Sequence, residues 1–165
     1  MSWSNALKLL LELEGGYTFT DDPDDPGGKT YAGITLTFVE GQCPELARDF
    51  PKLLTNEQVA NIYFKYFWKP SHCDVIPEPA DSVFFQMTCN LGLGHAMLCL
   101  QAALSVLPDG DFGPETQRAL RMIKGDELAE RLLIAQATYY AAHSNPEKRG
   151  LQNRVLKVKH ALWGG

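Results

Sequence analysis

The first stretch of the chain carries apolar residues on one helical face. They recur at helical spacing over positions 3–11, as Trp3, Ala6, Leu7, Leu10 and Leu11. This pattern is typical of an amphipathic helix with one buried face. Gly15 and Gly16 come next. Because glycine readily adopts the left-handed conformation found at helix ends, we expect the helix to stop there.

Glu14 lies at the end of this apolar face. It follows Leu10 and Leu7 by four and seven positions, so its carboxyl group is predicted to lie among buried neighbours. Apolar surroundings and the negative end of the helix dipole both favour the protonated carboxyl group, which a general acid requires. The alternative is that Glu14 extends into solvent at a frayed helix end. Glu12, four residues after Lys8, lies on another face, where an exposed ion pair is expected.

An acidic loop and a short extended segment follow the first helix. The loop carries aspartates between prolines and glycines, and they are Asp21, Asp22, Asp24 and Asp25. Residues 29–35 then contain strand-forming side chains, together with threonine and glycine. A buried acid, a loop with a second carboxylate and an extended segment are typical of a glycosidase.

Further helices are predicted by caps and by apolar spacing. Residues 55–58 have the form of a capping box and open a helix that carries a cluster of aromatic side chains. A second helix is expected over 79–90. The segment 94–107 is apolar nearly all round, which predicts the central helix of the fold. Residues 38–51 are expected to be irregular, because glycine and two prolines interrupt them.

The last third of the chain is also predicted to be helical. Pro114 suits the first turn of a helix, and an Asp-Gly turn at 109–110 precedes it. Gly125 is expected to end that helix, and the next runs from Asp126 to about residue 143. A final helix has an apolar face, formed by Leu151, Val155, Val158 and Leu162.

Composition narrows the class of protein. The chain has 165 residues, 45% of them hydrophobic, which fits one domain or two small lobes sharing a core. A net charge of −5 argues against nucleic-acid binding and against capture by anionic membranes. No apolar run approaches the roughly 20 residues of a membrane span, and Glu12 and Glu14 interrupt the first apolar stretch, so neither a membrane anchor nor a signal peptide is expected. The cysteines lack zinc-site spacing, and we expect reduced thiols, no metal and no other cofactor.

Several motifs resemble those of a known family. Two lie early in the chain, Glu14-Gly15-Gly16-Tyr17 and Asp25-Pro26-Gly27-Gly28, the second extended by Thr30, Gly33, Ile34 and Thr35. Later ones are Ile62-Tyr63 with Phe67-Trp68, Phe85 with Asn90 and Gly92, and Gly150 with Asn153-Arg154-Val155. Together they are similar to glycoside hydrolase family 108, whose members are lysozyme-like muramidases and often phage or prophage endolysins. Gln86 and Leu151 depart from the pattern, which has an aspartate and a tryptophan there.

A further motif resembles the peptidoglycan-binding module that accompanies this family. Its parts are Leu100-Gln101 with Leu104, and Asp109-Gly110 with Phe112-Gly113 and Thr116. The resemblance implies a mainly α, lysozyme-like helical bundle with a small N-terminal lobe that is irregular or bears a β-hairpin. Residues 1–90 would form the catalytic region, and residues 91–165 a helical peptidoglycan-binding-like region packed on it as one globule.

The same resemblance implies function and site residues. The expected reaction is hydrolysis of the β-1,4 bond between N-acetylmuramic acid and N-acetylglucosamine in bacterial peptidoglycan, by a monomer. It would be made in the host cytoplasm and reach the periplasmic wall after holin-type or lytic release. Glu14 matches the catalytic acid, Asp25 is the candidate second catalytic group, and Thr30 would position a water. Candidate substrate contacts are Tyr17, Tyr31, Tyr63, Trp68 and Asn90, although the alternative for the aromatic side chains is a place in the core.

Two alternative functions remain at this point. One is a non-catalytic cell-wall-binding or secretion-accessory protein, against which an intact Glu14 argues, because a binding module gains nothing from a half-buried acid. The other is a zinc amidase or peptidase acting on the stem peptide, which needs clustered histidine and acidic ligands. The histidines are dispersed, as His72, His95, His143 and His160.

Overall fold

A computed structural model describes residues 3–21, 28–52, 54–142 and 149–164, and in this part the chain is mainly helical with one small antiparallel sheet. The first elements are α1 (Trp3–Leu13), β1 (Phe19–Thr20), β2 (Thr30–Tyr31), β3 (Ile34–Thr35), α2 (Leu36–Gln42), α3 (Pro44–Ala47) and α4 (Asn56–Tyr63), which continues into a π-helical turn, η1 (Phe64–Trp68). After a short 3₁₀ turn, η2 (Cys73–Val75), come α5 (Ala80–Leu91), α6 (Leu93–Ala103), α7 (Pro114–Leu120), α8 (Gly125–Ala142) and α9 (Arg149–Trp163).

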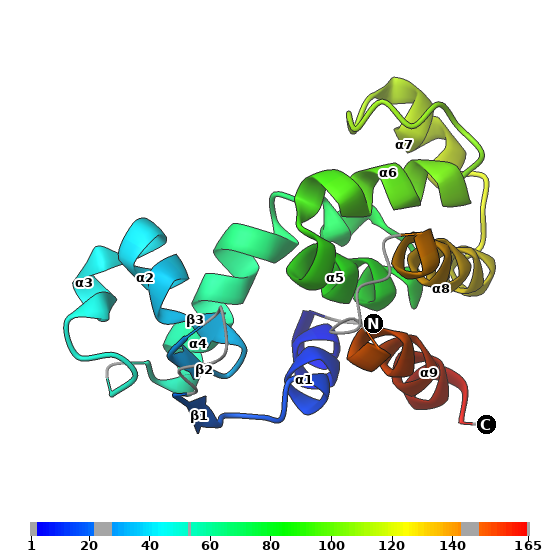
Figure 1. The fold of residues 1–165 in the computed structure, drawn as a ribbon. Coiled ribbons are helices and arrows are strands. Elements are labelled where there is room, and N and C mark those ends of the chain that lie inside the picture. The colour runs from blue at the N-terminus through cyan, green and yellow to red at the C-terminus, as the bar shows by residue number, and fades with distance from the viewer. Residues whose placement is uncertain (1–2, 22–27, 53, 143–148, 165) are drawn as a thin grey trace.

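The elements form a small lobe and a larger helical body. The sheet and helices α2, α3 and α4 make up the lobe, and α5, α6, α8 and α9 make up the body (Figure 1). In the sheet, β2 is the middle strand, and Thr30 pairs with Thr20 on one side and with Thr35 on the other. The predicted mainly α, lysozyme-like fold with a small hairpin-bearing N-terminal lobe is confirmed. No helix in the described ranges is both long and apolar enough to cross a membrane.

The expectation that residues 38–51 are irregular is wrong. Most of α2, which begins two residues earlier at Leu36, and all of α3 lie in this region. The Thr35 hydroxyl caps α2 by accepting the N–H of Phe38 at 3.1 Å, and Val39 on this helix is fully buried. Pro44 lies in the first turn of α3, where the missing N–H costs nothing. Capping and burial therefore outweigh the residues that would break a longer helix.

Helix α4 begins as the capping box predicts. The N–H of Gln58 donates to the Thr55 hydroxyl at 3.2 Å, and the N–H of Thr55 donates to the Gln58 side-chain oxygen at 2.8 Å. The helix starts at Asn56, directly after the cap. A local hydrogen-bond motif thus fixes the start of the helix that carries the aromatic cluster.

The central helix is α5 and not α6, which corrects a second expectation. Every residue of α5 from 80 to 88 is buried, because this helix packs against α1, α6 and α8 together. On α6, by contrast, His95 and Leu98 are exposed. The apolar composition of 94–107 therefore reflects one buried face and one open face, and composition alone does not distinguish this from full burial.

The motif around Gln101 has a structural role. Its buried side-chain amide donates to Asp109 Oδ1 at 2.6 Å and to the Thr116 hydroxyl at 3.2 Å, while its oxygen accepts the N–H of Gly110 at 2.8 Å. Hydrogen bonds from the Asp111 N–H and then from Gln101 hold the pKa of the Asp109 carboxyl below its ordinary value. One buried amide thus fixes the turn that leads into α7.

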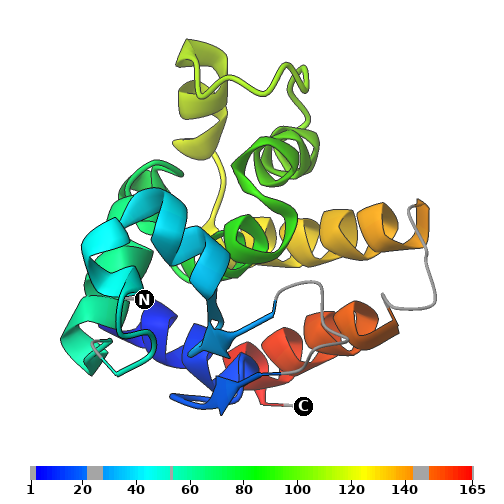
Figure 2. The same cartoon turned by 60° about the vertical axis from the view of Figure 1, so that its left-hand side comes forward.

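The two ends of the described chain lie together. Helices α1 and α9 run side by side in both views of the fold (Figures 1 and 2). Helix α1 buries its predicted face, with Leu10 fully inaccessible, against α5 as well as α9. Its exposed face carries Lys8 and Glu12, whose charged groups lie 3.9 Å apart, as predicted.

The start of α8 gives a test of packing in the body. Helix α7 ends at Leu120, and Gly125 is the first residue of α8 and not the end of α7. A Cβ atom at Gly125 would overlap the backbone carbonyl of Glu78, whereas one at Gly94 in α6 would meet no atom within 4 Å. We expect Gly125→Ala to lower the free energy of unfolding by about 1–3 kcal/mol, the usual cost of overpacking.

Gly94→Ala is the matched control, and it should leave the free energy of unfolding unchanged or slightly higher. Urea denaturation of both variants, followed by circular dichroism, measures the difference. Equal stability of the two variants would contradict the close packing of α8 on the backbone before α5.

Candidate functional site

A cavity of about 330 Å³ lies at the C-terminal end of α1, where the small lobe meets the helical body. Residues at β3 and on α2, α4 and η1 form one side, and the end of α5 forms the other. The lining residues are Glu14, Gly33, Ile34, Thr35, Phe38, Tyr63, Phe67, Cys89 and Asn90. Glu14 carries the one carboxyl group among these described lining residues, so any acid–base chemistry of this lining centres on it.

The backbone at the end of α1 fixes the position of Glu14. Its N–H still donates to the Leu10 carbonyl at 3.0 Å, as in a helix. Gly15 then has φ +85°, and the N–H of Gly16 returns to the Leu11 carbonyl at 2.7 Å. This is the glycine-dependent helix end expected from the sequence. Glu14 is therefore held by the last turn of a rigid helix.

The carboxyl group of Glu14 has a charged partner. Nη2 of Arg154, on α9, donates a hydrogen bond to Oε1 of Glu14. The two side chains are only 24% and 13% exposed, for Glu14 and Arg154 respectively, so water screens this ion pair less than it screens a surface pair. Arg154 Nη1 donates to Asn90 Oδ1 at 2.8 Å. Glu14 thus lies in a half-buried polar cluster and not among apolar side chains alone.

Arg154 is a site residue that the sequence analysis did not assign. It belongs to the motif that closes the chain, but no role followed from that motif. A usable signal was present, because Arg154 precedes the fully buried Val158 by four positions and so lies on the inner face of α9. A cation on a buried helix face needs an anion, and Glu14, four positions after the buried Leu10, is a carboxyl group on the inner face at the end of α1.

The small lobe contacts Glu14 through Gly33 and Tyr63. A Cβ atom at Gly33 would lie 2.7 Å from the Tyr63 hydroxyl and 3.0 Å from Glu14 Cγ, so only glycine fits there. Tyr63 is buried, and its hydroxyl donates to the Ala32 carbonyl at 2.8 Å. Burial, with the nearby Cys89 and Glu14, raises the pKa of Tyr63 far above its ordinary value. Tyr63 is therefore a neutral wall of the cavity.

Trp68 does not lie at the cavity, which corrects its assignment as a substrate contact. It is 4% exposed, and its ring packs edge-on against Trp3 and Phe85 at centroid distances of 5.3 and 5.4 Å. Phe67, its neighbour in η1, lines the cavity instead. Trp68 is therefore a core residue, which was the alternative for the aromatic side chains. A ring enclosed on several sides has no face left for a sugar.

Two other predicted substrate contacts, Tyr17 and Tyr31, are not among the residues that line the cavity. Tyr17 is 40% exposed, and its ring lies 6.4 Å from that of Tyr31, which is half-buried in β2. Asn90, in contrast, lines the cavity and accepts from Arg154. The cavity thus brings together Glu14, Asn90 and Tyr63, and its lining does not include Tyr17 and Tyr31.

The sequence offered two candidates for the second part of the catalytic machinery, Asp25 as the second catalytic group and Thr30 to position a water. Asp25 lies outside the described residues. Thr30 is half-buried, its hydroxyl donates to the Gly28 carbonyl at 3.2 Å, and it is not among the residues that line the cavity. Thr35, its partner across the sheet, does line the cavity.

The described residues offer no metal site and no activated thiol beside Glu14. Among them, no group of three or more histidine, cysteine or acidic side chains could hold a metal ion. Burial raises the pKa of the Cys89 thiol well above its ordinary value, and Glu14 adds to the increase. Cys89 therefore stays protonated and does not act as a nucleophile.

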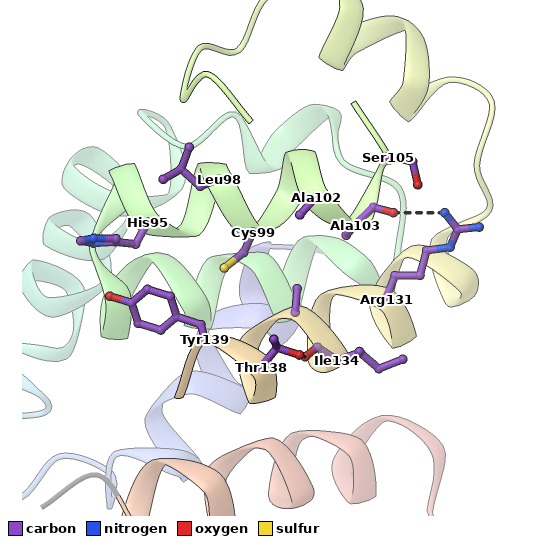
Figure 3. Close-up of a pocket in the computed structure, with 11 residues that line it drawn as sticks. His95, Leu98, Cys99, Ala102, Ala103, Ser105, Arg131, Ile134, Thr138 and Tyr139 are labelled. Carbon is purple, nitrogen blue, oxygen red and sulfur yellow. Dashed lines mark hydrogen bonds between the residues drawn. The ribbon is translucent and has the colours of Figure 1, made fainter. Parts of the chain in front are cut away.

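A larger groove, of about 510 Å³, lies between α6 and α8 in the helical body (Figure 3). Its lining includes Ala102, Ala103 and Ala135. At one end Arg131 donates to the Ala103 carbonyl at 3.1 Å, and at the other His95 faces Tyr139 (Figure 3). It shares no lining residue with the Glu14 cavity.

Comparison with known proteins agrees with this architecture. The solved structure of Brucella abortus SagA superimposes with a TM-score of 0.80 at 26% sequence identity, covering 98% of this chain and 93% of that one. No curated protein sequence is significantly similar to the chain. Residues 95–154, which include the groove of Figure 3, match the "Predicted Peptidoglycan domain". Residues 7–92, more than half of the chain, match "Glycosyl hydrolase 108". The chain therefore belongs to glycosyl hydrolase family 108 and is a glycosidase that acts on peptidoglycan.

Proposed function

We propose that the protein is a lysozyme-type N-acetylmuramidase, which hydrolyses the β-1,4 bond between N-acetylmuramic acid and N-acetylglucosamine with Glu14 as general acid. One observation carries the proposal: a half-buried carboxyl group at the end of a rigid helix lines a cavity between two lobes. Glycosidases place a proton donor of this kind beside the scissile bond.

Glu14 acts on the leaving group. As the bond between the muramic anomeric carbon and the bridging oxygen breaks, Glu14 donates its proton to that oxygen. The positive charge that develops on the sugar ring is relieved when water adds to the anomeric carbon and loses a proton to a base. Gly33, having no side chain, leaves room beside the Glu14 methylene groups.

The remaining role is that of the base, which takes the proton of the attacking water. We assign this role to Asp25, from its place before Pro-Gly-Gly in the family pattern, with Thr30 orienting the water. The alternative for the orienting group is Thr35, which lines the cavity directly. Its hydroxyl accepts the N–H of Phe38 and retains its own proton for a water.

The biological setting that we propose is cell lysis. A muramidase of this kind, made in the host cytoplasm, would act on the periplasmic wall after holin-type or lytic release, as a bacteriolytic endolysin. The proposal rests on the similarity of its motifs to those of phage and prophage lysins.

Replacement of Glu14 tests the catalytic assignment. Glu14→Gln removes the proton donor but keeps an oxygen that can accept from Arg154, so the fold should persist. Turnover of purified peptidoglycan should fall at least the roughly hundredfold typical of general acid catalysis. Glu12→Gln, a change of the same kind on the exposed face of α1, should leave turnover unchanged. Similar rates for the two variants would remove Glu14 from the mechanism.

The products of digestion distinguish the proposed function from its alternatives. A muramidase releases fragments with reducing N-acetylmuramic acid ends, which mass spectrometry after borohydride reduction identifies. Free stem peptides would indicate an amidase or peptidase instead. An absence of soluble fragments, with retention of the protein on the wall, would indicate a binding protein.

Stereochemistry tests the assignment of the base. An inverting glycosidase holds its carboxyl groups about 6.5–9.5 Å apart with a water between, and a retaining one about 5–5.5 Å. We expect inversion, because Asp25 follows two glycines and lies in a proline-bounded loop eleven positions after Glu14. Proton NMR of the first-formed reducing end measures this. An initial β-anomer would mean retention and would exclude a water-activating role for Asp25.

A further inference from the structure

We propose that Arg154 and Asn90 are positioning residues, which orient the Glu14 carboxyl group through a chain of hydrogen bonds anchored in the core of the helical body. The inference rests on the proposed role of Glu14 and extends it to residues on three other helices. Arg154 lies on α9, and Asn90 and Gln86 lie on α5. Gln136 and Tyr140, the last residue of the hydrogen-bond chain, lie on α8.

The chain of hydrogen bonds is continuous. Arg154 joins Glu14 to Asn90, as described above. Asn90 Nδ2 donates to the Gln86 carbonyl at 2.6 Å and to Gln86 Oε1 at 3.2 Å. Gln86 Nε2 donates to Gln136 Oε1 at 2.8 Å, and Gln136 Nε2 donates to the Tyr140 hydroxyl at 3.1 Å. Helices α5, α8 and α9 of the body thus contribute side chains to one connected polar path.

Arg154 sets the direction of every bond in this chain. A guanidinium has donors and no acceptor, so Asn90 must present its oxygen to Arg154 and its NH₂ group to Gln86. Gln86 must then present oxygen to Asn90 and NH₂ to Gln136. The same argument leaves the NH₂ group of Gln136 for Tyr140. One charged group therefore determines the orientation of three side-chain amides, which could otherwise turn either way.

Burial makes this orientation rigid. Gln86, Gln136 and Tyr140 are each at most 1% exposed, so no water can replace a broken link without disturbing the core. The chain therefore fixes Arg154 from behind, and Arg154 engages Oε1 of Glu14. Oε2 is then the oxygen left to carry the proton that the leaving group receives.

A kinetic effect separates positioning from simple structural support. Loss of the fixed geometry lowers the rate of the chemical step more than substrate affinity, because misplacement of a reacting group costs up to about a hundredfold. A lysine at position 154 keeps the positive charge but lacks the planar donor fork that joins Glu14 to Asn90, so charge alone should not restore the rate.

The experiment compares three variants on purified peptidoglycan, with initial rates measured by reducing-end release over a range of substrate concentrations at one pH. We expect Arg154→Met to lower kcat about tenfold or more with little change in KM. Arg154→Lys keeps the charge but not the two-pronged donor, so it should also lower kcat and leave KM nearly unchanged. Lys69→Met, which removes a surface cation paired with Asp74 at 3.2 Å, should change neither kcat nor KM.

The outcomes are distinct from those of the proposed function. Wild-type kcat in folded Arg154→Met would overturn the inference, while an inactive Glu14→Gln variant would still support the proposed function. If Arg154→Met fails to fold, Arg154→Lys decides: lowered kcat at unchanged thermal stability supports positioning, and wild-type kcat excludes it. An active Glu14→Gln variant would remove the proposed function itself.

Discussion

The half-buried ion pair between Glu14 and Arg154 is the interaction on which the site depends. Removing charges from water is costly, and the attraction between them offsets that cost only where the geometry is good and the remaining donors are bonded. Here both side chains keep partial access to solvent, and the second guanidinium arm is bonded to Asn90, while Nε of Arg154 is buried and has no hydrogen-bond partner among the described residues. Loss of one partner would leave the other charge largely buried and without a counter-ion. The pair therefore couples the two ends of the chain, since α1 and α9 must lie side by side for it to form (Figure 2).

The helices place these groups at their ends, where function and backbone geometry meet. Glu14 directly follows the last residue of α1 and precedes Gly15, and Asn90 lies two residues before Gly92, whose φ of +75° ends α5. Side chains at such positions have a rigid helix on one side and a change of chain direction on the other. This arrangement lets them border a cavity while their backbone stays ordered, which a catalytic group held within a narrow tolerance requires.

The features that the sequence predicted correctly depend on contacts within one helical turn. The helix end at Gly15 and Gly16, the capping box at Thr55 and the inward face of Glu14 are all of this kind. The features that it missed depend on distant partners. Arg154 meets Glu14 across 140 positions, Trp68 is enclosed by Trp3 and Phe85, and the burial of α5 follows from three other helices. Periodicity shows that a face is buried, but it does not show which groups lie opposite.

Gln86 illustrates how a departure from the family pattern fits this chain. An aspartate in its place would put a second carboxyl group at a site that is 1% exposed, one residue away in the hydrogen-bond path from the guanidinium. An ionised carboxylate there would compete with Glu14 for the positive charge of Arg154, because a buried anion is stabilised by the nearest cation. The amide avoids this competition, and Gln136 offers the complementary oxygen and NH₂ group. A neutral amide pair in the core thus leaves the charge of Arg154 to Glu14 alone.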